Sequence, residues 1–187
     1  MSVDYSEKIL TVKDLEVQFN LRGQVLTAIR GISLDIYKGE SLAIVGESGS
    51  GKSVFTKTFM GMLDKNGKVT KGEILYNGMD LAKFGSEKDW LKIRGKEVAM
   101  VFQDPMTSLN PLKTVGKQIQ EALELHQNLH GRAARERTIE ILSDVGIAEP
   151  ERRYKQYPHE FSGGMRQRAV IATAIACNPN ILICDEP

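Results

Sequence analysis

Eight consecutive residues, Gly46 to Ser53, combine glycines, an ammonium group and hydroxyls in a spacing that suits phosphate binding. The glycines of this run, GESGSGKS, allow backbone N–H groups to turn toward a triphosphate. The Lys52 ammonium can face the terminal phosphates, and the Ser53 hydroxyl can bind Mg²⁺. A helix that follows the run would begin with its positive dipole end toward the anion. The sequence therefore predicts a phosphate-binding loop, with a plain glycine-rich turn as the alternative; the spacing is not the G-x-G-x-x-G of a dinucleotide fingerprint.

Two adjacent glycines lie at the predicted start of a later helix. Ser162 is a good N-cap, and Gly163 and Gly164 leave the first backbone N–H groups of the helix uncovered. The pattern predicts a second anion-binding helix start in the same chain. A helix that is merely well capped is the alternative.

Two acidic residues, Asp185 and Glu186, follow the apolar run 181–184. Carboxylates at the end of a buried strand are costly unless a cation lies beside them. Mg²⁺ bound to a phosphate would meet that need. Another apolar run, 98–102, stops at Gln103.

Hydrophobic periodicity predicts the elements that must position these residues. Alternating or continuous apolar patterns predict strands over 9–19, 26–36, 42–45, 71–78, 98–102 and 181–184. Helical patterns cover 54–62, 86–94, 132–145, 169–176 and a stretch that begins near Thr114. The stretch from Thr114 to Val145 is rich in Glu, Gln, Arg and Leu, which indicates a helical subdomain inserted into an α/β protein.

Composition argues against several classes of protein. The 187 residues have a net charge of +1, so no long-range positive field favours nucleic acid. Cys177 and Cys184 lie in apolar runs and are expected to be small buried residues of a protein in a reducing compartment. No apolar run approaches the roughly 18 residues of a membrane span, and the charged first residues do not resemble a signal peptide. His126 and His130 lie one helical turn apart without the Glu of H-E-x-x-H, so we expect no metal there.

These motifs, taken together, resemble the ATP-binding subunit of an ABC transporter. The order and spacing match a Walker A loop at 46–53, a Q-loop at Gln103, the signature at 161–167 and Walker B at 181–185. The stretches 101–111 and 157–168 are similar to the oligopeptide and dipeptide importers, a subgroup that includes nickel and glutathione systems. The resemblance implies a P-loop ATPase fold of α/β class, with an N-terminal antiparallel β subdomain and the inserted helical subdomain at about 106–165.

The resemblance also implies ATP and Mg²⁺ as cofactors, and it gives the matching positions their roles. The residues expected to bind ATP are Phe19, Gly46, Ser48, Gly49, Ser50, Gly51, Lys52 and Ser53. Phe19 would stack on adenine, although an ordinary aromatic residue at a strand end is the alternative. The metal would be held by Ser53, Gln103 and Asp185, and catalysis would depend on Glu186, which orients water, and on Gln103. The signature residues expected to face the ATP of the opposite subunit are Ser162, Gly163, Gly164, Met165 and Gln167.

Partners follow from the same resemblance. A second, homologous ATPase subunit would form a head-to-tail dimer, transmembrane permease subunits would bind it at the cytoplasmic face of the membrane, and an extracytoplasmic substrate-binding protein would act through them. No nucleic acid is expected. The sequence stops at Pro187, before the D-loop and the switch histidine of the family, so we expect a fragment that does not hydrolyse ATP alone.

Two other functions stay open at this stage. A soluble ABC ATPase that acts on DNA or ribosomes is one, although the stretch between the loop and the signature is too short for a long coiled coil. A non-catalytic nucleotide-binding remnant is the other. The transported substrate is not visible in the sequence, because peptide rests on the subgroup resemblance alone.

Overall fold

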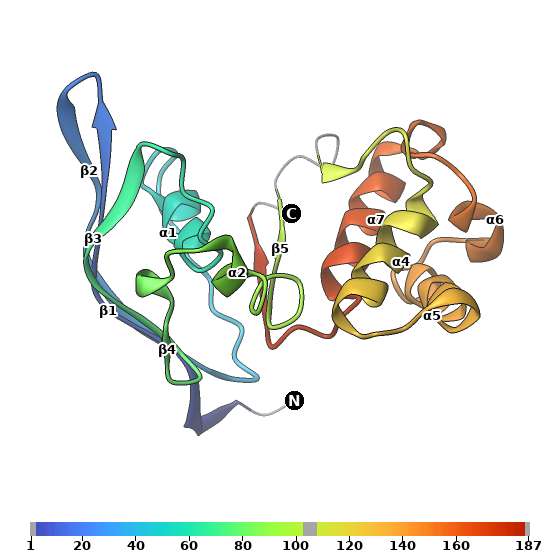
Figure 1. The fold of residues 1–187 in the computed structure, drawn as a ribbon, viewed down its shortest axis with the longest axis horizontal. Coiled ribbons are helices and arrows are strands. Elements are labelled where there is room, and N and C mark those ends of the chain that lie inside the picture. The colour runs from blue at the N-terminus through green and yellow to red at the C-terminus, as the bar shows by residue number, and fades with distance from the viewer. Residues whose placement is uncertain (1–2, 103–107, 186–187) are drawn as a thin grey trace. The chain divides into compact units, whose positions relative to one another are not determined.

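A computed structural model describes residues 3–102 and 108–185 of the chain (Figure 1). The chain divides into two compact units, Met1–Trp90 and Leu91–Pro187. The first unit holds an antiparallel sheet and the phosphate loop. The second holds a parallel strand pair and most of the helices.

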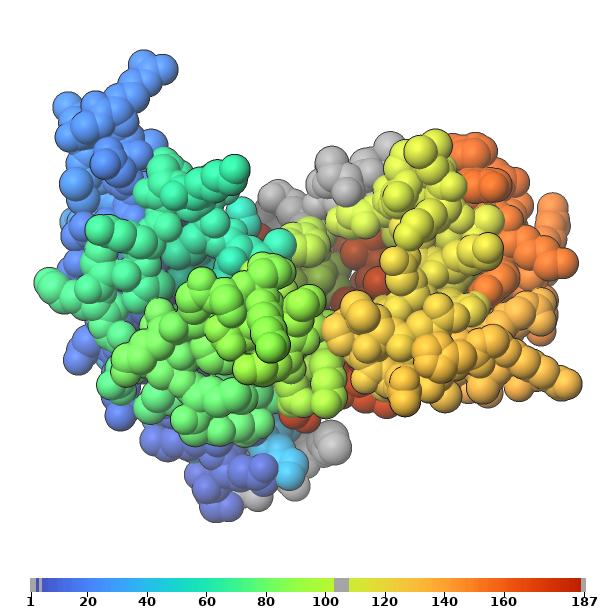
Figure 2. Space-filling model, in the orientation of Figure 1, coloured from blue at the N-terminus to red at the C-terminus, as the bar shows by residue number. Residues whose placement is uncertain are grey.

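The sheet of the first unit has four strands in the order β2-β1-β3-β4. Their bounds are β1 Asp4–Leu21, β2 Gln24–Lys38, β3 Gly67–Tyr76 and β4 Met79–Asp80. Two-residue turns join β1 to β2 and β3 to β4; in each, both residues have positive φ, which is the backbone of a type I′ turn. The Asn77-Gly78 pair has the sequence that this turn favours. The first turn projects beyond the rest of its unit (Figure 2).

One face of this sheet is buried. Alternate residues of β1 and their partners on β3 are less than 2% exposed, for example Val12 opposite Ile74 and Leu10 opposite Tyr76. The helix α1, Lys52–Thr58, packs Phe55 into this core, and the ring of Phe55 meets that of Phe59 edge to face at 4.9 Å. The predicted strands 9–19 and 26–36 are therefore confirmed within the longer β1 and β2, and the predicted strand 71–78 is found as β3, which begins at Gly67 and ends at Tyr76.

The helix after the phosphate loop is shorter than the predicted 54–62. Gly61 has φ +58, its N–H donates to the carbonyl of Thr58, and the Met62 N–H donates to the carbonyl of Lys57. This pattern closes a helix at its C-terminus. A Cβ at Gly61 would lie 2.1 Å from the Trp90 ring, so only glycine fits this closing turn. Two short helices complete the unit, η1 Leu81–Lys83 and α2 Glu87–Trp90, the second shorter than the predicted 86–94.

The predicted buried strand 42–45 is wrong for the structure as described. Residues 41–47 belong to no strand, and Leu42, Ile44 and Val45 are 46%, 40% and 89% exposed. A strand exists only where a neighbour satisfies its backbone N–H and C=O groups, and the described strands of the sheet pair only with one another. The apolar composition of 42–45 predicted a strand, but it could not show whether a partner strand lies beside it.

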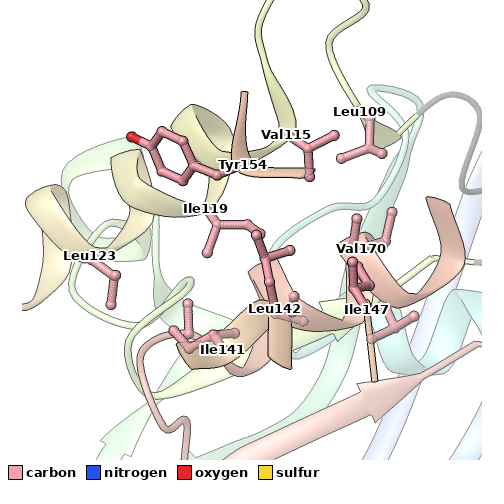
Figure 3. Close-up of a cluster of buried hydrophobic side chains, with 14 of the residues drawn as sticks. Leu109, Val115, Ile119, Leu123, Ile141, Leu142, Ile147, Tyr154 and Val170 are labelled. Atoms are coloured by element: carbon pink, nitrogen blue, oxygen red, sulfur yellow. The ribbon is translucent and has the colours of Figure 1, made fainter. Parts of the chain in front are cut away.

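The second unit is built on the parallel pair β5, Val98–Val101, and β6, Ile181–Cys184. Its helices are α4 Val115–His126, α5 Gly131–Asp144, α6 Pro150–Tyr154, η2 Pro158–Glu160 and α7 Gly163–Ile175. Apolar side chains of α4, α5, α6 and α7 form one buried cluster, which Ala99 and Val101 of β5 join (Figure 3). Three buried alanines of α7 let that helix approach its neighbours closely, namely Ala169, Ala172 and Ala174; Ala176, the C-cap residue, is buried as well.

Cys177 is buried as expected, but Cys184 is exposed. The reason is the alternation along β6, in which Ile181 and Ile183 face the core while Leu182 and Cys184 lie on the uncovered face. Among residues 3–102 and 108–185, no helix is both long and apolar enough to cross a membrane.

We predict that Gly72→Ala is strongly destabilising. Gly72 has φ +88, and a Cβ there would lie 2.4 Å from the Lys13 carbonyl oxygen, opposite the bulge of β1 at Asp14. Backbone strain and the collision together should lower the free energy of unfolding by about 3 kcal/mol or more, measured by urea denaturation.

Gly23→Ala is the matched control. Gly23 has φ +87 but no atom within 4 Å of a Cβ, so only the strain of about 1–2 kcal/mol applies. Equal losses in the two variants would show that the close approach of β1 and β3 at Gly72 is not a packing constraint.

Candidate functional site

The phosphate loop connects β2 to α1 in the first unit. Gly49 and Gly51 have φ +80 and +96, a region that other residues rarely adopt, and Gly51 is the residue that precedes α1. The Ser50 N–H donates to the Glu47 carbonyl at 3.1 Å, which closes the loop on itself. A Cβ at Gly46 would lie 2.7 Å from Ser50 Oγ, so a side chain there would require the serine hydroxyl to turn away. The loop is exposed from Gly46 to Ser50.

Lys52 folds back over this loop. Its Nζ donates to the carbonyl oxygens of Gly46 and Glu47, at 2.8 and 3.0 Å. An ammonium group has three N–H donors, and two are used by these carbonyls. The structure therefore places the positive charge of Lys52 at the loop.

The start of α1 lies against β2. A Cβ at Gly51 would lie 2.9 Å from Ile29 Cδ1 and 3.1 Å from the Ala28 carbonyl oxygen. Ile29 is opposite Val17 on β1, and both side chains are buried. The inner face of the sheet therefore holds the last residue of the loop in place.

Phe19 lies on the same face of the same sheet. It follows Val17 by two residues, so the two side chains share a face, and its partner on β2 is Leu26. Ala28 is then roughly 7 Å farther along β2 and one strand spacing of about 5 Å away. Phe19 is half-buried and lines a groove of about 510 Å³. One nucleotide can span this separation between a ring and a phosphate loop.

The signature residues begin α7 in the second unit. The Ser162 hydroxyl accepts a hydrogen bond from the Met165 N–H at 3.3 Å, which confirms the predicted N-cap. Ser162, Gly163 and Gly164 are exposed, and a Cβ at either glycine would meet no atom within 4 Å. Met165 and Gln167 are half-buried on the first turns of the helix. The first residues of this helix are therefore exposed, and both glycines have room for a side chain beside them.

Asp185 follows β6 at the carboxyl edge of the strand pair. Its N–H donates to the Val101 carbonyl at 3.0 Å, which continues the ladder of β5 and β6 by one residue. The side chain is half-buried. Because β5 and β6 are parallel, residues that follow both strands lie at one edge. The two other residues predicted for this edge, Gln103 and Glu186, lie outside the described residues.

The structure thus places each half of the predicted site within its own unit. Phe19 and Gly46 to Ser53 lie on one face of the first unit, while the signature and Asp185 belong to the second. The described residues hold no cluster of three or more His, Cys, Asp or Glu side chains suited to a metal. His126 packs against Gly95, and burial, with a smaller contribution from Lys96, lowers the pKa of its imidazole.

Comparison with known proteins assigns the chain to a family. The family model described as "ABC transporter" matches residues 29–187. The chain belongs to the ABC transporter family.

The relatives of this ABC transporter chain include peptide transport proteins. The oligopeptide transport ATP-binding protein AmiE of Streptococcus pneumoniae is 56% identical over 96% of this chain and 50% of its own length. The oligopeptide transport ATP-binding protein OppD of Bacillus subtilis is 54% identical, with the same coverage. The chain therefore spans about half the length of these curated relatives.

A solved structure of the ATP-binding cassette MJ0796, a dimer in a post-hydrolysis state bound to ADP and Pi, is 30% identical. It superposes with a TM-score of 0.82 over 94% of this chain and 73% of its own. The predicted fold class, an ABC ATPase core of α/β type with an antiparallel β subdomain, is confirmed.

Sequence reasoning missed two arginines that anchor the signature of this ABC chain. Arg166 Nε donates to the Phe161 carbonyl at 3.0 Å, and Arg168 Nη1 donates to the Gly146 carbonyl at 3.1 Å. Phe161 itself is 2% exposed. The arginines therefore tie the start of α7 to the chain before it and to the turn after α5. These contacts could not be predicted from the sequence, because the position of the arginines on the first two turns of a helix does not say which carbonyls outside the helix they bind.

We predict that Ser162→Ala lowers the free energy of unfolding by about 1 kcal/mol, because the Met165 N–H loses its acceptor at the helix start. Ser162→Asp supplies a carboxylate acceptor at the same position and should retain the stability. Thermal or urea denaturation of the three proteins measures the difference. If the Asp variant is destabilised as much as the Ala variant, the cap does not contribute as described.

Proposed function

We propose that this chain binds Mg²⁺-ATP through the loop Gly46–Ser53 and energises the import of peptides through a membrane ABC transporter, as a transport-coupled ATPase. The observation that carries the proposal is the loop itself. Its glycines adopt positive φ before a helix, and Lys52 Nζ lies over the loop carbonyls. This arrangement gathers N–H groups and one positive charge for a polyphosphate.

The individual residues would then share the work. Gly46, Ser48, Gly49, Ser50 and Gly51 give backbone contacts to the phosphates, and Lys52 and Ser53 contact the terminal phosphates and Mg²⁺. Asp185 and Gln103 would complete the surroundings of the metal. Glu186 is proposed to orient and polarise the attacking water.

The base would lie on Phe19. An aromatic ring on the inner face of the sheet, one strand away from the seat of the loop, suits stacking with a purine. The groove that Phe19 lines has the volume of an ordinary ligand site.

The signature supports a role in a dimer. Ser162, Gly163 and Gly164 are exposed at a helix start, and we propose that they contact the nucleotide held by a second, homologous ATPase subunit. Permease subunits at the cytoplasmic face of the membrane, and through them an extracytoplasmic substrate-binding protein, complete the assembly. The whole of 1–187 would form one nucleotide-binding domain, with its helical subdomain at about 106–165. Peptide as the substrate is supported by the names of relatives such as AmiE and OppD.

Lys52→Ala in the intact protein should weaken ATP binding by about tenfold or more, because a charge-assisted contact worth roughly 1.5–3 kcal/mol is lost. Lys57→Ala is the control, since Lys57 lies in the last turn of the same helix. Calorimetric titration with Mg²⁺-ATP measures both. Unchanged affinity in Lys52→Ala would remove the assignment of the phosphate loop.

Gly164→Ala should separate stability from activity. A Cβ at Gly164 meets nothing within 4 Å, and alanine favours a helix by up to about 1 kcal/mol over glycine, so the folded protein should be as stable or more stable. The added methyl group would stand before the uncovered N–H groups, and ATP hydrolysis by the intact protein should fall by at least about tenfold.

Gly85→Ala provides the comparison for this variant, because a Cβ there also meets no atom within 4 Å but lies far from any predicted nucleotide contact in the sequence. Phosphate release and the melting temperature are measured for both variants. Hydrolysis at the wild-type rate in Gly164→Ala would exclude the signature from contact with nucleotide.

A further inference from the structure

Gly67, on β3, lies directly against the ring of Phe19. A Cβ at Gly67 would lie 2.5 Å from Cε1 of the ring and 2.9 Å from both Cδ1 and Cζ. These distances locate the contact on the ring. A point in the ring plane beyond Cε1 would be much farther from the two neighbouring carbons than from Cε1 itself. The Cβ position is therefore above the face of the ring, and Gly67 covers one face of Phe19.

The backbone does not demand glycine at this position. Gly67 does not have a positive φ, so any L-residue could adopt its backbone conformation. The neighbouring ring alone excludes a side chain, since any Cβ closer than 3.0 Å forces something to move. Here the atoms that would move belong to the end of a side chain, so the ring would be displaced while the strands stay paired.

Gly67 itself is held firmly. It is the cross-strand partner of Phe19, and its N–H donates to the Asp64 carbonyl at 2.8 Å. The preceding residue, Asn66, accepts from the Asn20 N–H at 2.9 Å and donates through Nδ2 to the Asn20 carbonyl at 3.2 Å. These hydrogen bonds fix the position of Gly67 against the face of the Phe19 ring.

We propose that Gly67 is a positioning residue for the nucleotide base: it holds Phe19 by one face so that adenine stacks on the other. This inference rests on the proposed function, because it assumes that ATP binds at the loop Gly46–Ser53. The half-buried ring of Phe19 lines the 510 Å³ groove, and Gly67 lines it as well. The residues that line this groove include the ammonium groups of Lys65 and Lys68 and no carboxylate, which suits an anionic ligand.

A purely structural role for the pair has to be separated from this one. Aromatic residues opposite glycine also stabilise sheets by covering the exposed backbone. Such a role would change the free energy of unfolding and would not distinguish a ligand that carries a base from one that lacks it. A positioning role changes the affinity only for a ligand that carries a base.

The experiment compares Mg²⁺-ATP with Mg²⁺-ribose 5-triphosphate, which lacks the base, by titration of the intact protein. The variants are Gly67→Ala, Phe19→Ala and the double variant, with Gly85→Ala as a control glycine whose Cβ meets no atom within 4 Å. Base stacking on an aromatic ring is worth about 1–3 kcal/mol, so Gly67→Ala and Phe19→Ala should each weaken ATP binding by about tenfold. The affinity for ribose 5-triphosphate should stay unchanged, and the double variant should lose no more than Phe19→Ala alone.

Four results would overturn the inference. They are unchanged ATP affinity in Gly67→Ala, unchanged ATP affinity in Phe19→Ala, an equal loss for both ligands, and a loss in the double variant equal to the sum of the single losses. In each case the wild-type protein still binds ATP, so binding of the phosphates by the loop stands; only unchanged affinity in Phe19→Ala would also remove the proposed stacking of the base on Phe19. If the wild-type protein binds neither ligand, the proposed function fails and the inference fails with it.

Discussion

The pairing of β1 with a strand on each side is the constraint on which the first unit's half of the site depends. Through β2, the ladder fixes Ile29 and Ala28, against which Gly51 packs at the end of the phosphate loop. Through β3, it fixes Gly67 under the ring of Phe19. Since β1 itself carries Phe19, a single strand sets the spacing between the ring proposed to stack on the base and the loop proposed to bind the phosphates. A shift of register by one residue would turn Phe19 to the opposite face.

In the second unit, the constraint is different: uncovered N–H groups lie at an exposed helix start. A helix end exposed in this way needs support from elsewhere, because its first donors have no partner within the helix. The Ser162 hydroxyl satisfies one donor, and Arg166 and Arg168 fasten the turn to the carbonyls of Phe161 and Gly146. Below them, the alanines of α7 pack into the cluster shown in Figure 3. The exposed glycines therefore begin a helix that is held in place by its cap, the two arginines and the packed cluster.

Structural features that depend on neighbouring residues could be predicted from the sequence. Features that depend on contacts with distant segments could not. The turn at Asn77-Gly78 and the cap at Ser162 depend only on their own neighbours, and the cap is found as predicted. The predicted strand 42–45 failed because apolar residues do not by themselves provide a partner strand. The placement of Gly67 could not be predicted either, since glycine before a strand is ordinarily a turn residue. Its role emerges only from the register that sets it opposite Phe19.

Glycines in this chain fall into groups that have different physical causes. Gly49 and Gly51 are required by backbone conformation, and Gly67 is required by a neighbouring ring. Gly163 and Gly164 have neither cause among the described residues, since their φ values are not positive and a Cβ would meet nothing. They also begin a helix, where glycine costs stability relative to alanine. A residue that weakens its own helix and relieves no contact with the described residues of its unit is best explained by something that approaches from outside, and the N–H groups beside it suit an anion.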